Sequence, residues 1–385
     1  MSLEKAKTIC RTLVESYGNN AIDIQGGEPT IYPHIYELIA YCRDIGLLPT
    51  LITNALVLDK SDTCTRFIEA GLRDCLVSVH GLGDTYDRIV GVPGAHQRQM
   101  KGIDNLCVGG IPFRFNCVLS KTALADLRGV AKLAMDSGAR VVNFIAFNPF
   151  EDQQKSGKRS DENVPRYSEV GGPLTEAMDM LESAGIEANV RYYPICMVEE
   201  RHRKSVYNFQ QLPYDIHEWD YASWSWTGMT SQRMRDGHLS HVISLEEATI
   251  RPVEYPGPLN RLAVRVRKSL EPHPKLFDCA VRVHRSVSAS VQRRRTGQRQ
   301  ESGKDWLYRE NARIRARDHC KYVYGEDCGH CSAQAICDGF HGDYASLFGT
   351  AEAVPIEGEL SASDPRHYIA EQDKVVEIED YGWAL

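Results

Sequence analysis

The sequence has no excess of positive charge and no long hydrophobic run. Its formal net charge of -7 over 385 residues gives no general attraction to nucleic acid or to an anionic membrane surface. No apolar stretch approaches the length of a membrane span, and one of the longest, VVNFIAF (Val141 to Phe147), is typical of a core strand. The N-terminus lacks the hydrophobic region of a signal peptide and is typical of an amphipathic helix. We therefore expect a cytoplasmic protein and do not expect a membrane or nucleic acid as its partner.

Strand-like and helix-like segments alternate over the first half of the chain. The apolar strand-like runs cover residues 21–25, 48–53, 74–80, 113–119, 140–147 and 186–193. Segments with helical periodicity cover residues 33–47, 61–72, 123–139 and 171–186. Their ends are marked by the capping residues Ser61 and Asp62 and by the glycines Gly46, Gly71, Gly138 and Gly185.

Alternating strands and helices with continuous apolar strands predict an α/β fold, in which a parallel sheet is covered by helices. The number of units fits a barrel, a partial barrel or an open doubly wound sheet. In each of these architectures, ligands gather at the carboxyl ends of the strands. The regular alternation stops after Tyr193, so the length fits one large domain with an appendage, or two domains.

The first predicted strand ends in an unusual turn, GGEPT, which begins at Gly26. Gly26 and Gly27 have no Cβ, so the backbone there can approach a ligand closely. Glu28 then places a carboxylate over the end of the sheet, and Pro29 stiffens the exit. A carboxylate beside exposed backbone carbonyls suits the ammonium group of a ligand.

The strand, the GGEPT turn and the following helix and strand resemble the radical S-adenosylmethionine superfamily. The resemblance covers about Ala21 to Tyr193. It implies that Gly26, Gly27, Glu28 and Pro29 bind the methionine end of S-adenosyl-L-methionine. It also implies that Ser78, Asn116 and Asn143, near the ends of later strands, contact the cofactor.

The sequence lacks the C-x-x-x-C-x-x-C motif that defines this family, in which three thiolates hold a 4Fe–4S cluster. The only cysteine before Gly26 is Cys10, and no three cysteines have the family spacing. We therefore expect a partial (β/α) barrel that lacks its first strand and cluster loop. We expect a fragment rather than a degenerate family member.

Four cysteines gather near the C-terminus, where Cys328, Cys331 and Cys337 form C-x-x-C-x5-C and Cys320 precedes them. A C-x-x-C turn directs two thiolates at one centre, and both zinc and iron–sulfur clusters accept such ligands. His319 and His330 are alternative ligands for zinc.

The C-terminal cysteines resemble the SPASM or twitch extensions of radical enzymes, which hold auxiliary 4Fe–4S clusters. The resemblance implies one auxiliary cluster, because no cysteine follows Cys337. In such extensions an early ligand can come from just after the barrel, where Cys196 lies. The fourth ligand is therefore Cys320 or Cys196, and the sequence does not separate them.

Two other segments have ordinary structural explanations. The tryptophans Trp219, Trp224 and Trp226 can line a substrate pocket, but covering the open side of the barrel is the better interpretation. The basic stretch 282–317 is better explained as a solvated helix than as a phosphate-binding surface. The polar segment 151–166 is long enough to be a lid.

We thus expect four regions: the truncated barrel at 1–193, an aromatic and basic region at 194–310, the cysteine-rich region at 311–345 and an acidic tail at 346–385. The expected function is 5′-deoxyadenosyl radical chemistry on a peptide or small molecule, with flavodoxin or ferredoxin as electron donor. Without the cluster motif, this chain is expected to be inactive. The alternative is a non-catalytic binding module stabilised by zinc or an iron–sulfur cluster on a degenerate barrel.

Overall fold

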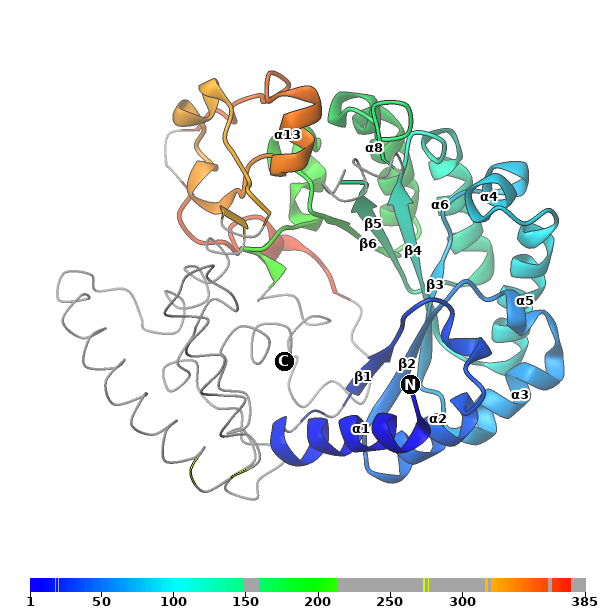
Figure 1. Ribbon diagram of the computed structural model, residues 1–385. Helices are drawn as coiled ribbons and strands as arrows, with labels where there is room; N and C mark the ends of the chain where they lie inside the picture. Colours follow the sequence, from blue (N-terminus) through cyan, green and yellow to red (C-terminus); the bar gives the residue numbers. More distant parts are fainter. Residues whose placement is uncertain are drawn as a thin grey trace.

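The computed structural model describes residues 1–17, 19, 21–148, 159–212, 273, 276, 316–317, 320–358 and 362–374. Seven parallel strands form one curved sheet (Figure 1). They are β1 (Ala21–Ile24), β2 (Leu48–Thr53), β3 (Asp74–Ser78), β4 (Phe113–Leu119), β5 (Val141–Ala146), β6 (Glu187–Arg191) and β7 (Val206–Tyr207). The strands pair in chain order from β1 to β7. A doubly wound sheet would reverse this order at a switch point, so the architecture is a half-barrel.

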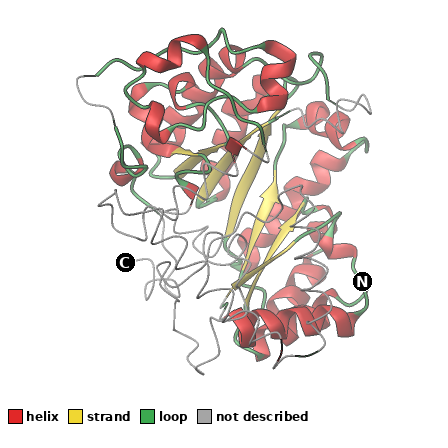
Figure 2. Ribbon diagram, turned by 60° about the vertical axis from the view of Figure 1, so that its left-hand side comes forward, coloured by secondary structure: helices red, strands yellow, loops and turns green. Residues whose placement is uncertain are grey.

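Helices cover the convex, outer face of the sheet, as two views show (Figures 1 and 2). The α-helices are α1 (Leu3–Tyr17), α2 (Ile35–Asp44), α3 (Ser61–Ala70), α4 (Gly83–Val90), α5 (Ala95–Gly109), α6 (Leu127–Ser137), α8 (Tyr167–Ser183) and α13 (Gly342–Phe348). The 3₁₀ helices are η1 (Pro29–Ile31), η2 (Leu56–Asp59), η3 (Leu124–Asp126), η4 (Ile195–Met197), η5 (Glu200–Ser205), η10 (Glu326–His330), η11 (Gln334–Ile336) and η12 (Ile369–Glu371). None of the described helices is long and apolar enough to span a membrane.

The six predicted strands are confirmed, and most of their ends lie within two residues of the expected positions. β7 was not expected, because two residues are too few for a periodic pattern. The predicted N-terminal capping residues of α3 were wrong, because Lys60 is the N-cap and Ser61 is already helical, whereas the predicted end at Gly71 is confirmed. α8 begins at Tyr167, before the expected Gly171, and Pro173 lies inside the helix. The expectation that the chain lacks the first strand and cluster loop of the family barrel stays a prediction, as do the four region boundaries.

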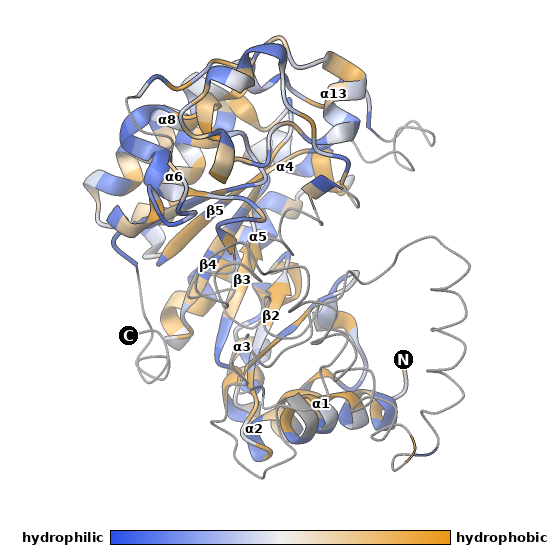
Figure 3. Cartoon of the chain, turned by 90° about the vertical axis from the view of Figure 1, so that its left-hand side faces the viewer, coloured by the Kyte–Doolittle hydropathy of each residue, from blue (hydrophilic) through white to orange (hydrophobic). Residues whose placement is uncertain are grey.

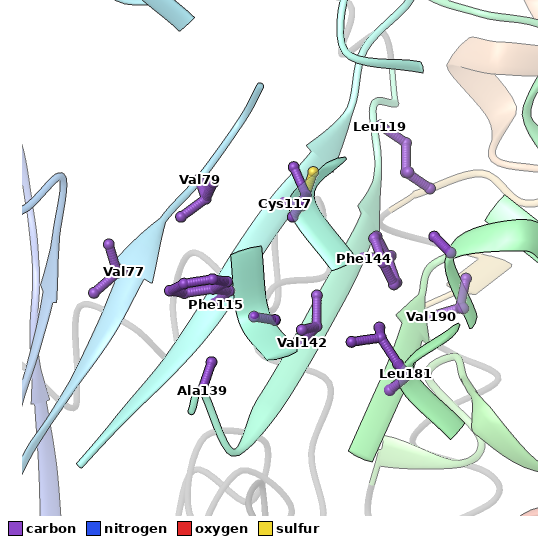
Figure 4. Packing of buried hydrophobic residues seen from close by; sticks show 14 of the residues in the cluster. Val77, Val79, Phe115, Cys117, Leu119, Ala139, Val142, Phe144, Leu181 and Val190 are labelled. Carbon is purple, nitrogen blue, oxygen red and sulfur yellow. The ribbon is translucent and has the colours of Figure 1, made fainter. Parts of the chain in front are cut away.

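The main hydrophobic core lies between the outer face of the sheet and the helices. Phe115, Phe144 and Val190 are fully buried there, and Leu181 of α8 packs over the same face (Figure 4). Each fully buried side chain of this size contributes roughly 1.5–3 kcal/mol. The colouring by hydropathy shows apolar residues along the strands and mixed surfaces on the helices (Figure 3). The outer face therefore supplies most of the hydrophobic stabilisation.

The inner face of the sheet carries polar side chains at matching heights. Side chains alternate between the faces of a strand, so Ser78 and Asn116 point away from the core residues beside them. Ser78 pairs with Asn116, Asn116 with Asn143, and Asn143 with Asn189. These four residues form one row across β3 to β6, called here the polar row.

The cysteine-rich segment packs on the β6 side of the half-barrel, opposite β1 (Figure 1). The ring of Tyr344 stacks on that of Tyr167, with centroids 3.9 Å apart. The Tyr344 hydroxyl accepts a hydrogen bond from the Tyr167 amide at 2.8 Å and contacts Glu352 Oε1 at 2.6 Å. The segment and the barrel therefore share one core.

Several predicted features fall outside the described residues. They are the tryptophans Trp219, Trp224 and Trp226, residue His319, most of the basic stretch 282–317, and the first part of the polar segment 151–166.

Gly102 of α5 sits where a side chain cannot fit, because an added Cβ would lie 2.3 Å from the Ala55 carbonyl oxygen. We predict that Gly102→Ala lowers the free energy of unfolding by about 1–3 kcal/mol, the usual scale of overpacking. Gly172 of α8 is the matched control, because nothing lies within 4 Å of an added Cβ there. Gly172→Ala should stabilise by up to about 1 kcal/mol through helix propensity. Urea unfolding measures both; equal effects would contradict the packing of α5 on η2.

Candidate functional site

The GGEPT turn forms a backbone shape that favours glycine. Gly26 and Gly27 have φ angles of +108° and +50°. A Cβ built on either residue would meet nothing within 4 Å, so the space in front of the turn is open. Both glycines are exposed at the carboxyl end of β1. The turn therefore presents backbone groups to a ligand at the edge where parallel sheets bind ligands.

The Glu28 carboxylate joins the end of β1 to the end of β2. Its Oε1 accepts hydrogen bonds from the Thr30 amide at 3.1 Å, the Thr30 hydroxyl at 2.6 Å and the Thr53 hydroxyl at 2.7 Å. Its Oε2 accepts one, from the Asn54 amide at 2.8 Å. These bonds hold the side chain in one orientation.

A carboxylate offers about four lone-pair positions, two on each oxygen. Oε1 already has three donors, whereas Oε2 has one. Oε2 can therefore accept another hydrogen bond, and a ligand ammonium is the strongest donor for it. The turn and Glu28 together therefore offer acceptors to a ligand ammonium group.

The polar row has two residues whose side chains are free to bind a ligand and two whose side chains bind each other. The first two are called here the available half. Ser78 and Asn116 are partly exposed, and within the described chain neither side chain has a hydrogen-bond partner. Asn143 is 5% exposed, and its Oδ1 accepts a hydrogen bond from Asn189 at 3.1 Å. Ser78 and Asn116 are thus better placed than Asn143 to bind a ligand.

His80 follows β3 on the same side as Ser78. Its Nδ1 accepts a hydrogen bond from the Val118 amide at 3.3 Å, so the neutral ring carries its proton on Nε2. Burial lowers the pKa of His80 to about 4. The ring is therefore a neutral hydrogen-bond donor at physiological pH.

The C-terminal segment covers the inner face near β5 to β7. Lys374 Nζ lies 2.6 Å from Glu187 Oε1, and the Glu187 side chain is fully buried. Gln372 donates to the Ala188 carbonyl at 2.8 Å and contacts Asn189 Oδ1 at 3.1 Å. Asn189 also donates to Glu187 at 2.8 Å. This segment closes the side of the half-barrel opposite the glycine turn.

Four cysteines line one cavity beside the barrel. Cys196, on η4 after β6, faces the same space as Cys328, Cys331 and Cys337. This cavity is partly open to solvent, and its other walls are mainly apolar. All four are free thiols. In the described chain, no group of three or more potential ligands is close enough to hold a single metal ion.

The surroundings of these sulfurs suit thiolate ligands. The Gly339 amide donates to Cys337 Sγ at 3.3 Å, and the Ile356 amide donates to Cys331 Sγ at 3.3 Å. Burial raises the pKa of Cys337 to about 12, and it also raises the pKa values of Cys196 and Cys328. These thiols stay protonated unless a metal displaces their protons. Amide hydrogen bonds to sulfur are a means of tuning iron–sulfur clusters.

The other predicted ligands lie elsewhere. Cys320 packs against a second hydrophobic cluster that contains Tyr322 and Phe209. His330 is exposed and is not among the residues that line the cavity. The structure thus brings Cys196 to the C-x-x-C-x5-C segment and places Cys320 apart from the cavity.

Sequence reasoning missed three residues of this site: Thr53, Asn54 and Asn189. Thr53 and Asn54 bind Glu28 from the next strand, and Asn189 extends the polar row. Polar residues at the end of LPTLITN, directly after an apolar run, were the available signal for the first two. Asn189 gave no signal, because its role depends on strand register.

The chain is similar in sequence and in structure to known proteins. Residues 1–134 match the model of the Radical SAM superfamily.

Over these residues the chain is therefore similar to the radical SAM superfamily.

The AdoMet-dependent heme synthase of Oleidesulfovibrio alaskensis is 31% identical over 150 residues, which cover 39% of this chain and 38% of that protein. The PqqA peptide cyclase of Methylorubrum populi is 30% identical over 135 residues, which cover 34% of each. The chain thus spans well under half the length of these curated relatives. Among solved structures, Streptococcus suis SuiB bound to S-adenosylmethionine is 20% identical, with a TM-score of 0.40, covering 57% of this chain and 48% of that one.

The low pKa of His80 predicts a pH-dependent stability. As pH falls below the ordinary value of 6.5, the unfolded chain takes up a proton while the folded His80 stays neutral until about pH 4. Stability from this group is therefore complete above pH 6.5 and is lost between 6.5 and about 4, by at most about 3 kcal/mol.

His80→Asn keeps an acceptor for the Val118 amide and cannot titrate. We predict that it loses less stability than the wild type over this pH interval, measured by urea unfolding at both ends. The same loss in both proteins would show that His80 does not contribute.

Proposed function

We propose that this chain is a radical S-adenosylmethionine protein that holds one auxiliary 4Fe–4S cluster. The observation that carries the proposal is the Glu28 clamp at an open glycine turn, within the segment that matches the Radical SAM superfamily. In this superfamily the cofactor, when bound and reduced, supplies a 5′-deoxyadenosyl radical that abstracts hydrogen from a substrate.

The residues of the turn bind the amino end of the cofactor. The exposed backbone around Gly26 and Gly27, together with Glu28 Oε2, would accept hydrogen bonds from the ammonium group. Pro29 is buried and begins η1, which fixes the direction of the chain after the clamp. The turn therefore orients the cofactor as well as binding it.

The strand ends bind the rest of the cofactor. The Ser78 hydroxyl and the Asn116 amide both donate and accept hydrogen bonds, so they suit a ribose or a carboxylate. Asn143 supports them through its place in the polar row. Gln372 and Lys374 cover the inner face at β6, on the side away from the glycine turn. This cover would keep water away from the substrate.

We propose Cys196, Cys328, Cys331 and Cys337 as the ligands of the auxiliary cluster. In the described residues no three potential ligands lie close enough together for a single ion, so four thiols around one cavity suit a larger group such as a cluster. A single zinc ion, with Zn–S distances of about 2.3 Å, would draw its ligands to one point instead. The cluster would relay electrons or bind substrate, and flavodoxin or ferredoxin would be the external donor.

The sequence contains no C-x-x-x-C-x-x-C motif, so it lacks thiolates for a cofactor-cleaving cluster. We therefore propose that these 385 residues bind S-adenosylmethionine without cleaving it. The substrate would be a peptide or a small molecule. The curated relatives are named for both classes, a peptide cyclase and a heme synthase.

Glu28→Gln should weaken the binding of S-adenosylmethionine by about ten- to a hundredfold, the range of a lost charged hydrogen bond. The substitution removes the charge that attracts the ammonium group and turns an amide toward the Asn54 N–H. Isothermal titration calorimetry measures the affinity. Glu37→Gln, at an exposed carboxylate on α2, is the control and should bind as the wild type does. Unchanged affinity in a folded Glu28→Gln protein would refute the clamp.

Anaerobic reconstitution with iron and sulfide tests the second site. We predict four irons per chain and a broad visible absorbance band in the wild type. Cys196→Ala should lose most of the iron, because Cys196 lines the cavity. Cys320→Ala should retain the iron, because Cys320 does not line it. Loss of iron in the Cys320 variant alone would contradict the ligand set. One zinc and no iron in the wild type would favour a structural metal site instead.

A further inference from the structure

Gln99 of α5 is a buried amide behind the glycine turn. It is 0% exposed, and it reaches the sheet from the outer, helical side. Its Nε2 lies 2.9 Å from the Asn54 carbonyl, 2.9 Å from the Ser78 carbonyl and 2.8 Å from the Tyr86 hydroxyl. One side chain therefore joins the ends of β2 and β3 to α4.

The two carbonyls belong to residues that carry the candidate site. The Asn54 amide donates to Glu28 Oε2, so Asn54 is held by Glu28 through its N–H and by Gln99 through its carbonyl. Ser78 carries the first side chain of the polar row, beside Asn116. Gln99 thus connects the Glu28 clamp to the available half of the polar row.

Packing alone does not explain an amide at this position. Gln99 Oε1 is buried without a hydrogen-bond partner in the described chain. An unpaired buried polar atom is destabilising, by about 1–3 kcal/mol in mutational data. The surrounding core is largely apolar and would accept a methionine of similar length. A residue that leaves one buried oxygen unpaired while its nitrogen joins two strand ends has the properties of a support for a binding site.

We propose that Gln99 is a positioning residue: it holds the ends of β2 and β3 at the spacing that lets Glu28 and Ser78 bind the same ligand. The ligand, S-adenosylmethionine, comes from the proposed function. The spacing of the strand ends is a property of the chain without any ligand.

The fold offers a matched control on the same helix. Asn105 of α5 donates its Nδ2 to the Leu58 carbonyl at 2.7 Å, on the side away from the turn. Gln99→Met and Asn105→Leu each remove an amide that binds a backbone carbonyl, and each keeps a similar shape. Both substitutions should lower the melting temperature.

Only Gln99→Met should loosen the strand ends. We predict that hydrogen exchange of the ligand-free protein becomes about tenfold faster at residues 53–56 and 78–82, and that affinity for S-adenosylmethionine falls about tenfold. Asn105→Leu should leave both quantities unchanged. Equal exchange and equal affinity in the two variants would overturn the proposal.

The two readouts separate this proposal from the proposed function. If the wild type does not bind S-adenosylmethionine but exchange still rises only in Gln99→Met, the ligand is wrong and the positioning role stands. If the wild type binds and exchange does not change, the positioning role is wrong. Should Gln99→Met fail to fold, Gln99→Asn, which is one methylene shorter and cannot reach both carbonyls, takes its place with the same expected outcomes.

Discussion

The outer face of the curved sheet must be buried, and this constraint divides the roles of the two faces. The α-helices that connect the described strands lie on the convex side, so side chains such as Phe115 and Phe144 pack there and supply hydrophobic stabilisation. The alternating side chains, among them Ser78 and Asn116, must then point to the concave side. Because all strands run parallel, the polar groups after each strand meet at one edge. Packing on one face thus gathers hydrogen-bonding groups on the other.

At that edge, two buried polar contacts join neighbouring strands from opposite sides. Glu28 binds Asn54 from the ligand side, and Gln99 binds it from the helical side. Gly26 and Gly27 have positive φ angles, and the space in front of them is open, so a ligand can approach the backbone beside Glu28. At the other end of the sheet, Lys374 and Glu187 close the inner face. The site is therefore rigid where the cofactor would bind and covered where the substrate would lie.

Much of this arrangement could be predicted from the sequence, because it depends on local patterns. The strand LPTLIT and the strand FRFNCVL have the predicted ends, and GGEPT marked the turn through its residue types alone. Relations between distant segments could not be predicted. The spacing of Cys328, Cys331 and Cys337 indicated a metal site, but only the packing of α13 and η4 against one core shows that Cys196, and not Cys320, faces it. Gln99 looks like an ordinary polar helix residue until its contacts with the carbonyls at two strand ends are known.

The glycine turn and the strand ends behind it should act as one binding site for S-adenosylmethionine. Hydrogen exchange of the whole chain, with and without saturating S-adenosylmethionine, measures whether they do. We expect slower exchange at residues 24–30, 53–56 and 78–82 together, with no change in α1 or on the outer surface of α8. Absence of protection at these three segments, or protection confined to another part of the chain, would contradict it.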